Sequence, residues 1–125
     1  MRHPAAPPAA TSAAAVLAKA SVRAADLLAL KRGELAEVLG VSETTISRAA
    51  NGGSLPANAK TLELAALFVR VYRSLDSIVG GDDRVAARWM RGPNDALGAP
   101  PVDRIKTVEG LMAVLSYLDA RRALV

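Results

Sequence analysis

The sequence contains no cysteine, very few aromatic residues and a single histidine. Without cysteine, disulfides and thiolate metal sites are excluded. Because aromatic residues make up 3% of the chain and hydrophobic residues 51%, the core must consist of Leu, Val and Ala. No apolar run approaches the roughly 20 residues of a membrane-spanning helix. Pro4, Pro7 and Pro8 interrupt the N-terminal stretch, which therefore lacks the pattern of a signal peptide, and we expect a cytoplasmic protein without membrane contact.

Residues that could perform catalysis are equally scarce. The only histidine, His3, lies in this proline-rich stretch, and there is no Gly-rich phosphate loop and no His/Asp/Glu cluster at metal-ligand spacing. The adjacent carboxylates Asp82 and Asp83 have no ligand residue near them in sequence, so helix capping explains them better. The sequence therefore predicts neither an enzyme nor a bound metal or cofactor.

The most informative stretch is 34–51, which reads ELAEVLGVSETTISRAAN. An apolar-periodic run ends at Gly40, a residue suited to the left-handed end of a helix, and Ser42 can cap the next helix. Ala36 is small enough to lie where the two helices cross, and Ile46 and Ala49 face inward. This order and spacing indicate a helix-turn-helix, although a plain helical hairpin would have a similar turn.

The second helix of this motif would be the one that reads DNA. The side chains expected to contact DNA are Ser42, Thr44, Thr45, Ser47, Arg48 and Asn51, with Lys31, Arg32 and Lys60 as flanking phosphate contacts. Because this set contains few cations and Glu43 repels phosphate, a single copy should bind weakly. We therefore expect a homodimer that reads two half-sites.

The charge of the chain is uneven. Residues 1–75 contain nine Lys and Arg against five Asp and Glu, a net charge of +4, whereas residues 76–125 contain seven of each. The positive excess thus lies in the half that carries the helix-turn-helix, where phosphate attraction is needed. The excess is modest, so an ordinary solvated surface would also account for it.

Ala-rich composition without strict alternation predicts an all-α protein. We expect a disordered arm over 1–11, a helix-turn-helix domain over 12–59 in which Ser21 caps a second helix, a central helix over 60–81, and a C-terminal domain over 82–125. Asn58 or Thr61 would cap the central helix. Its polar residues form one narrow seam, Glu63, Arg70, Ser74 and Ser77, so it should be both a strut and a possible dimer interface.

The last fifty residues should form two helices joined by a loop. Asp82 or Asp83 would cap a helix that reaches about Met90, and 91–106 reads as a loop. Thr107 would cap the final helix, which extends to about Arg122 and buries Leu111, Val114, Leu115 and Leu118. In a chain so poor in aromatics, Trp89 is expected to be a packing anchor.

From Trp89 onward, the sequence resembles the C-terminal toxin-binding domain of the Xre/MbcA/ParS antitoxins. The family pattern has a Trp, then Pro-Asn-x-Ala-Leu-Gly, a nearby proline, and Thr-x-x-Gly at the start of the last helix. The matching residues are Trp89, Pro93, Asn94, Ala96, Leu97, Gly98, Pro101, Thr107 and Gly110. Ala99 departs from the pattern, which usually has a second glycine there. The upstream helix-turn-helix also looks like that family.

This resemblance implies the antitoxin of a type II pair. The expected partner is a RES-domain toxin encoded by an adjacent gene, similar in fold to ADP-ribosyltransferases and acting on NAD. Family members typically cover the toxin's active site with the C-terminal domain, and many repress their own operon through the helix-turn-helix. The expected toxin-binding residues are Trp89, Pro93, Asn94, Leu97, Gly98, Tyr117, Arg121 and Arg122.

Alternatives remain both for the role of the two terminal arginines and for the function of the protein. Arg121 or Arg122 could enter the toxin's NAD cleft, or both could simply stabilise the C-terminal end of their helix. The protein could be a stand-alone helix-turn-helix regulator whose C-terminal half only dimerises or binds a small ligand. It could also be a structural interaction protein without DNA, and salt-dependent DNA binding would distinguish that case.

Overall fold

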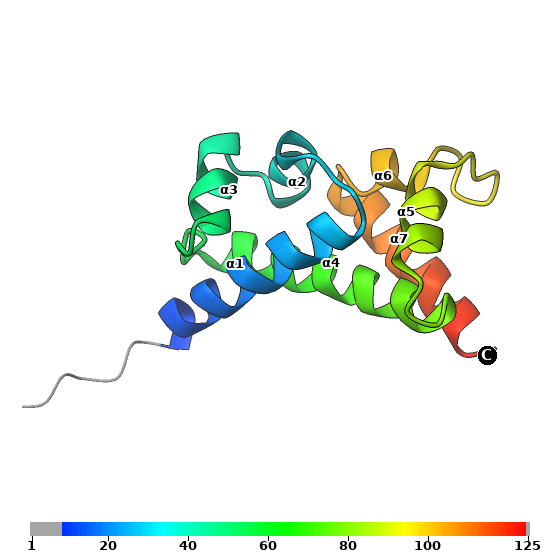
Figure 1. Ribbon diagram of the computed structural model, residues 1–125, viewed down its shortest axis with the longest axis horizontal. Helices are drawn as coiled ribbons and strands as arrows, with labels where there is room; N and C mark the ends of the chain where they lie inside the picture. The colour runs from blue at the N-terminus through cyan, green and yellow to red at the C-terminus, as the bar shows by residue number, and fades with distance from the viewer. Residues whose placement is uncertain (1–8, 125) are drawn as a thin grey trace, which may run out of the picture.

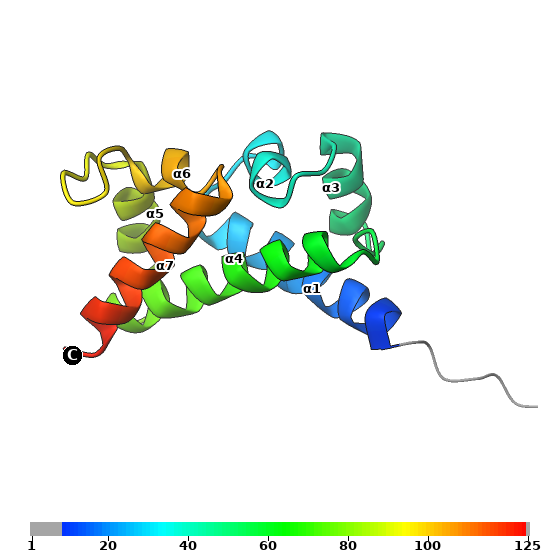
Figure 2. The same cartoon turned by 180° about the vertical axis from the view of Figure 1, so that it is seen from behind.

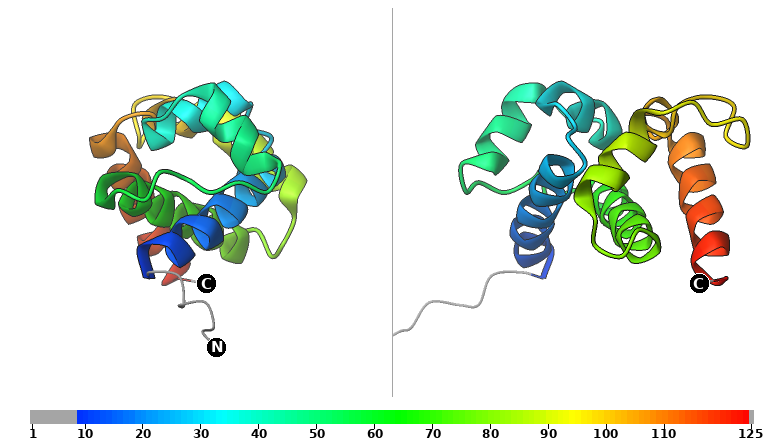
Figure 3. Two further views of the ribbon diagram at one scale, coloured as in Figure 1. Left: turned by 90° about the vertical axis from the view of Figure 1, so that its left-hand side faces the viewer. Right: turned by 45° about the vertical axis from the view of Figure 1, so that its right-hand side comes forward.

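The computed structural model describes residues 9–124. The longest helix in this range, α4, extends along the molecule (Figure 1). The helices are α1 (Ala9–Leu27), α2 (Arg32–Leu39), α3 (Glu43–Ala50), α4 (Ala59–Ile78), α5 (Asp83–Arg91), α6 (Pro101–Arg104) and α7 (Val108–Arg122). No strand occurs in the described range, so the predicted all-α class is confirmed. Figure 1 shows α1–α3 gathered along one part of α4 and α5–α7 along the other, and the right-hand view of Figure 3 shows α1 and α7 on opposite sides of α4.

The first helix is longer and less interrupted than the sequence suggested. Residues 1–8 of the expected disordered arm lie outside the described range, and α1 already begins at Ala9. Ser21 does not begin a second helix, because it lies within α1 and is 0% exposed. It belongs to a buried stripe of small residues at helical spacing, Ala14, Ala18, Ser21 and Ala25, on a helix that packs against both α4 and α3.

The predicted helix-turn-helix is confirmed as a structural unit. Gly40 ends α2 in the left-handed conformation with φ of 67°, and Ser42 caps α3 by accepting a hydrogen bond from the Thr45 N–H at 3.1 Å. Ile46 and Ala49 are buried beneath α3, as expected. Helix α3 packs on both α1 and α2, which leaves its opposite face exposed.

The central helix α4 has the predicted role of a strut. Asn58 caps it through the Thr61 N–H at 2.9 Å, and it lies between α1 on one side and α7 on the other (Figures 1 and 2). Within one chain these two helices cover most of its apolar circumference, with Phe68 fully buried. Ser74, a member of the predicted polar seam, is 1% exposed, and its hydroxyl donates to Asp119 of α7 at 2.6 Å. The dimer role of α4 stays a prediction.

The C-terminal helices begin at the expected caps. Asp82 accepts hydrogen bonds from the first N–H groups of α5, and Thr107 accepts from the Gly110 N–H at 3.0 Å at the start of α7. The four residues predicted for the buried face of α7 are all buried. Part of the segment predicted as a loop forms the short helix α6, which begins at Pro101.

Candidate functional site

The exposed face of α3 is the first candidate surface. Thr44, Ser47 and Arg48 are exposed there, and within residues 9–124 Arg48 has no ion pair. The hydroxyls of Ser42 and Thr45 bond each other at 2.9 Å, and the Ser42 hydroxyl also caps α3. These contacts leave fewer free groups on α3 than the sequence suggested.

Three of the four remaining predicted DNA contacts, Asn51, Arg32 and Lys60, have partners inside the chain. Asn51 donates its side-chain amide to the Ser47 carbonyl at 3.0 Å, which closes the end of α3. Arg32 pairs with Asp26 at 3.1 Å, and Lys60 approaches Glu63 at 3.9 Å. Lys31 is exposed and makes no ion pair among the described residues. A cation free for phosphate therefore lies at the start of α2 and another on α3.

The loop after α5 is held by its own side chains. The Asn94 carboxamide oxygen accepts a hydrogen bond from the Leu97 N–H at 3.1 Å, which closes a turn. Gly98 follows with φ of 76°, and Leu97 packs against the core. One hollow at the surface is lined by Pro93, Asn94 and Gly98 of the motif together with Arg91.

The second candidate surface is an aromatic stack between α5 and α7. The rings of Trp89 and Tyr117 are stacked, with centroids 6.2 Å apart and an interplanar angle of 18°. The Arg121 guanidinium lies 5.5 Å from the centre of the Tyr117 ring, within the range of a cation–π contact. Trp89 is half-buried and packs at the edge of the core, so the packing-anchor prediction was only partly right. We call these three residues the Trp–Tyr–Arg surface.

Arg122 belongs to a different flank of α7. Its guanidinium reaches toward the Ser74 hydroxyl of α4 at 3.4 Å, in a hollow that Arg70, Arg73 and Asp119 also line. The structure therefore brings together three of the predicted toxin-binding residues, Trp89, Tyr117 and Arg121, and separates Arg122 from them.

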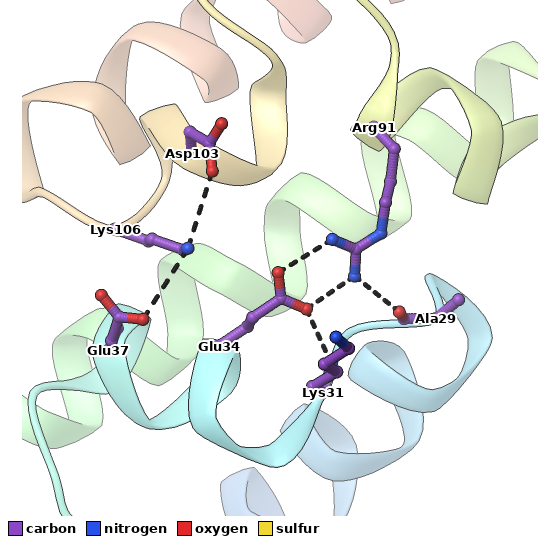
Figure 4. A network of polar contacts seen from close by, with 7 residues as sticks. All are labelled: Ala29, Lys31, Glu34, Glu37, Arg91, Asp103 and Lys106. Atoms are coloured by element: carbon purple, nitrogen blue, oxygen red, sulfur yellow. Dashed lines mark hydrogen bonds and ion pairs between the residues drawn. The ribbon is translucent and has the colours of Figure 1, made fainter.

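Sequence reasoning missed a polar network that links the two halves of the chain (Figure 4). Arg91, at the end of α5, donates to both carboxylate oxygens of Glu34 on α2, at 2.8 and 2.6 Å, and to the Ala29 carbonyl at 2.9 Å. Lys106 lies between Glu37 and Asp103, at 3.7 and 3.6 Å. Glu34 also accepts from the Lys31 backbone N–H at 2.9 Å.

This network determines the charge state of Glu34. The hydrogen bonds from Arg91 lower the pKa of Glu34 from 4.5 to about 2, against the opposing effect of burial. The same pairing raises the pKa of Arg91. Ala29 takes part through a backbone in the left-handed region, with φ of 59°, which turns the chain between α1 and α2. Both partners are therefore charged near neutral pH, and the end of α5 is fixed against α2.

Within residues 9–124, no group of three His, Cys, Asp or Glu side chains could hold a metal ion. None of the helices in this range combines the length and the apolar character needed to cross a bilayer.

Two family models match the chain. The model of the antitoxin Xre-like helix-turn-helix domain matches residues 7–70, which is more than half of the chain. The model of the antitoxin Xre/MbcA/ParS C-terminal toxin-binding domain matches residues 74–123, and these include the loop after α5 and the Trp–Tyr–Arg surface. No curated protein matches the chain significantly.

Proposed function

The chain belongs to the Xre-like antitoxins with an Xre/MbcA/ParS toxin-binding domain, and we propose that it neutralises a RES-domain toxin from an adjacent gene. The toxin would consume NAD or modify a target with ADP-ribose, and this chain would cover its active site. The Trp–Tyr–Arg surface carries the proposal, because it lies within the residues that match the toxin-binding domain.

The chemistry of this surface suits the centre of a protein interface. Trp, Tyr and Arg are the residue types most enriched where single side chains dominate binding energy. Stacking on Trp89 limits the freedom of the Tyr117 ring, and the ring in turn supports Arg121. Side chains that are ordered before binding lose less entropy on association. We therefore assign Arg121, rather than Arg122, to the NAD cleft of the toxin.

We also propose that the protein represses its own operon through α3. The exposed Thr44, Ser47 and Arg48 would enter the major groove, with Lys31 on a phosphate. Few of these groups are cationic, so one copy should bind weakly and the protein should act as a homodimer on two half-sites. Measuring its mass in solution by light scattering would test the dimer.

Co-expression with the product of the adjacent gene tests the antitoxin role. The neighbour alone should arrest growth and deplete cellular NAD, and this chain should restore both and co-purify with the neighbour. Arg121→Ala and Tyr117→Ala should each weaken the complex about 30-fold or more, the loss typical of a dominant interface residue. Arg48→Ala, on α3, is the control that should still neutralise fully.

A harmless neighbour would contradict the proposal. So would toxicity that persists although both proteins are present. In either case the chain would be better explained as a stand-alone helix-turn-helix regulator with a C-terminal dimerisation domain. Full neutralisation by Arg121→Ala, in contrast, would leave the antitoxin role intact and contradict only the assignment of Arg121.

A further inference from the structure

The hollow between the C-terminal ends of α4 and α7 has an excess of positive charge. Arg70 and Arg73 line it from α4 and Arg122 lines it from α7, whereas Asp119 is the one carboxylate among its described lining residues. Three arginines and one aspartate give it a formal charge of +2. Its volume of about 630 Å³ has room for several side chains rather than for one small ion.

The three arginines of this hollow make only weak contacts with other residues of the described chain. Asp119 of α7 accepts a short hydrogen bond from the buried Ser74 of α4 at 2.6 Å, which holds the Asp119 carboxylate against α4. The closest approach of Arg70 to Asp119 is 3.5 Å, and that of Arg122 to Ser74 is 3.4 Å, both at the outer limit of a hydrogen bond. Arg73 is exposed and makes no ion pair within residues 9–124. The donors of these arginines are therefore largely free.

We propose that this hollow receives an acidic segment of the toxin, with at least two carboxylates. The inference rests on the proposed antitoxin function and extends it. Arg122 and Arg121 are neighbours in the last turn of α7, so a partner docked on Arg121 also reaches the hollow around the end of the helix. A guanidinium group matches the geometry of a carboxylate and binds it with two parallel hydrogen bonds.

Operator DNA is a poorer fit for this hollow. Helix α3 lies near one end of the molecule and the C-terminal end of α7 near the other (Figures 1 and 2). Duplex DNA held in the major groove by α3 would thus lie far from Arg73 and Arg122. The loop and the aromatic stack that match the toxin-binding domain lie in the same half as the hollow. Position and charge together favour an acidic protein segment.

Reversing one charge in the hollow tests the inference. Arg73→Glu should weaken binding to the purified toxin about tenfold, and the remaining affinity should depend less on salt concentration. Since Arg73 is exposed, its replacement should leave the thermal unfolding midpoint unchanged. Arg73→Lys should retain most of the affinity. Lys19→Glu is the matched control, because it makes the same charge change at an exposed position of α1 and should bind the toxin like the wild type.

Each other result has a definite meaning. Wild-type affinity and wild-type salt dependence for Arg73→Glu would overturn the inference while leaving the antitoxin function in place. If Arg73→Glu loses affinity for DNA and keeps its affinity for the toxin, the hollow is a nucleic-acid contact and the inference is wrong. If the wild-type chain itself fails to bind the toxin, the proposed function is wrong and the inference fails with it.

Discussion

Gly110 lies where the first turn of α7 touches the end of α6. A Cβ atom at this position would collide with the backbone carbonyl of Arg104 and lie 3.0 Å from the Thr107 hydroxyl oxygen. That hydroxyl accepts the hydrogen bond that caps α7. Glycine therefore lets the cap and the end of α6 meet on the same helical turn, which is a physical reason for the Thr-x-x-Gly pattern in this chain.

Gly110→Ala should lower the free energy of unfolding by about 3 kcal/mol, at the upper end of the usual range for overpacking. The obstacle is backbone, which cannot move aside as a flexible side chain could. Urea denaturation followed by Trp89 fluorescence would measure the loss. Gly40→Ala is the control: its Cβ meets nothing within 4 Å, and only the positive φ of 67° opposes it, at about 1 kcal/mol. Equal losses at the two sites would contradict the steric explanation.

The Glu34–Arg91 pair should make stability depend on pH. The pKa of Glu34 falls from 4.5 to about 2 on folding, so the unfolded chain binds the proton more readily. The pair therefore stabilises the fold fully above pH 4.5, and this contribution is lost as the pH falls toward 2. Because the Arg91 side chain is 41% exposed, Glu34→Gln should cost about 1–2 kcal/mol at pH 7.

Urea unfolding of wild type and Glu34→Gln between pH 7 and pH 2.5 would measure this effect, and the difference between them should shrink with falling pH. Glu37→Gln is the matched control. Its carboxylate is 61% exposed and faces Lys106 at 3.7 Å, so its loss should change stability by less than about 0.5 kcal/mol. A constant difference for Glu34→Gln across this pH range would show that the ion pair does not stabilise the fold.

Local patterns predicted some single residues and not others. The caps Ser42 and Thr107 act within three residues of themselves, so the sequence was sufficient to predict them, and Asn58 was one of two candidates for its helix. Arg91 and Glu34 are 57 positions apart, and neither has a local pattern that indicates the other. The sequence indicated only that Ser74 belongs to a polar seam, because its partner Asp119 lies on a different helix. Contacts of this kind depend on packing, which periodicity does not report.

The DNA-reading surface proposed on α3 is short, and its strongest group is Arg48. Several of the predicted contacts are already used by the fold: Ser42 caps the helix and bonds the Thr45 hydroxyl, and Asn51 closes the end of the helix. Arg48 is exposed in the last turn, without an ion pair in the described part of the chain. Most of the base or phosphate contact made by this helix should therefore depend on one side chain.

Arg48→Ala should weaken operator binding about tenfold or more, as loss of a good base or phosphate contact does. Titration of upstream DNA at fixed salt concentration, followed by fluorescence anisotropy, would measure the change. Binding to the toxin should be unaffected. Arg84→Ala, which removes an exposed arginine from α5, is the matched control and should bind the operator normally. Unchanged operator affinity in Arg48→Ala would show that α3 is not the reading helix.

Helices with a clear start, stop and apolar stripe were predicted well. For α2, α3, α5 and α7 the sequence contains a cap or a glycine at the boundary, together with a regular buried face. Helix α6 has only four residues and begins with proline, so it has too few positions to show a period. The break expected at Ser21 was wrong because the same residue type caps a helix in one context and packs between helices in another.

The arrangement of the helices separates the two candidate surfaces. Helix α4 has 20 residues and is therefore about 30 Å long. Helix α3 lies near one end of α4, and the C-terminal part of α7 lies near the other end (Figure 2). The Arg91–Glu34 contact ties the half with the Trp–Tyr–Arg surface to α2 of the helix-turn-helix. Binding at one surface therefore leaves the other uncovered, while the two halves keep a fixed orientation.

The toxin and the operator should consequently bind the same antitoxin molecule at once. Adding purified toxin to the antitoxin–operator complex should produce a species of lower mobility in native gels, with operator affinity changed by less than about tenfold, which corresponds to 1.4 kcal/mol of coupling. Arg121→Ala, whose toxin contact is impaired, should bind the operator without this further shift. Release of DNA on toxin addition would mean that toxin binding changes the orientation of the two halves. Arg91→Gln, which removes the ion pair between them, should then weaken that effect.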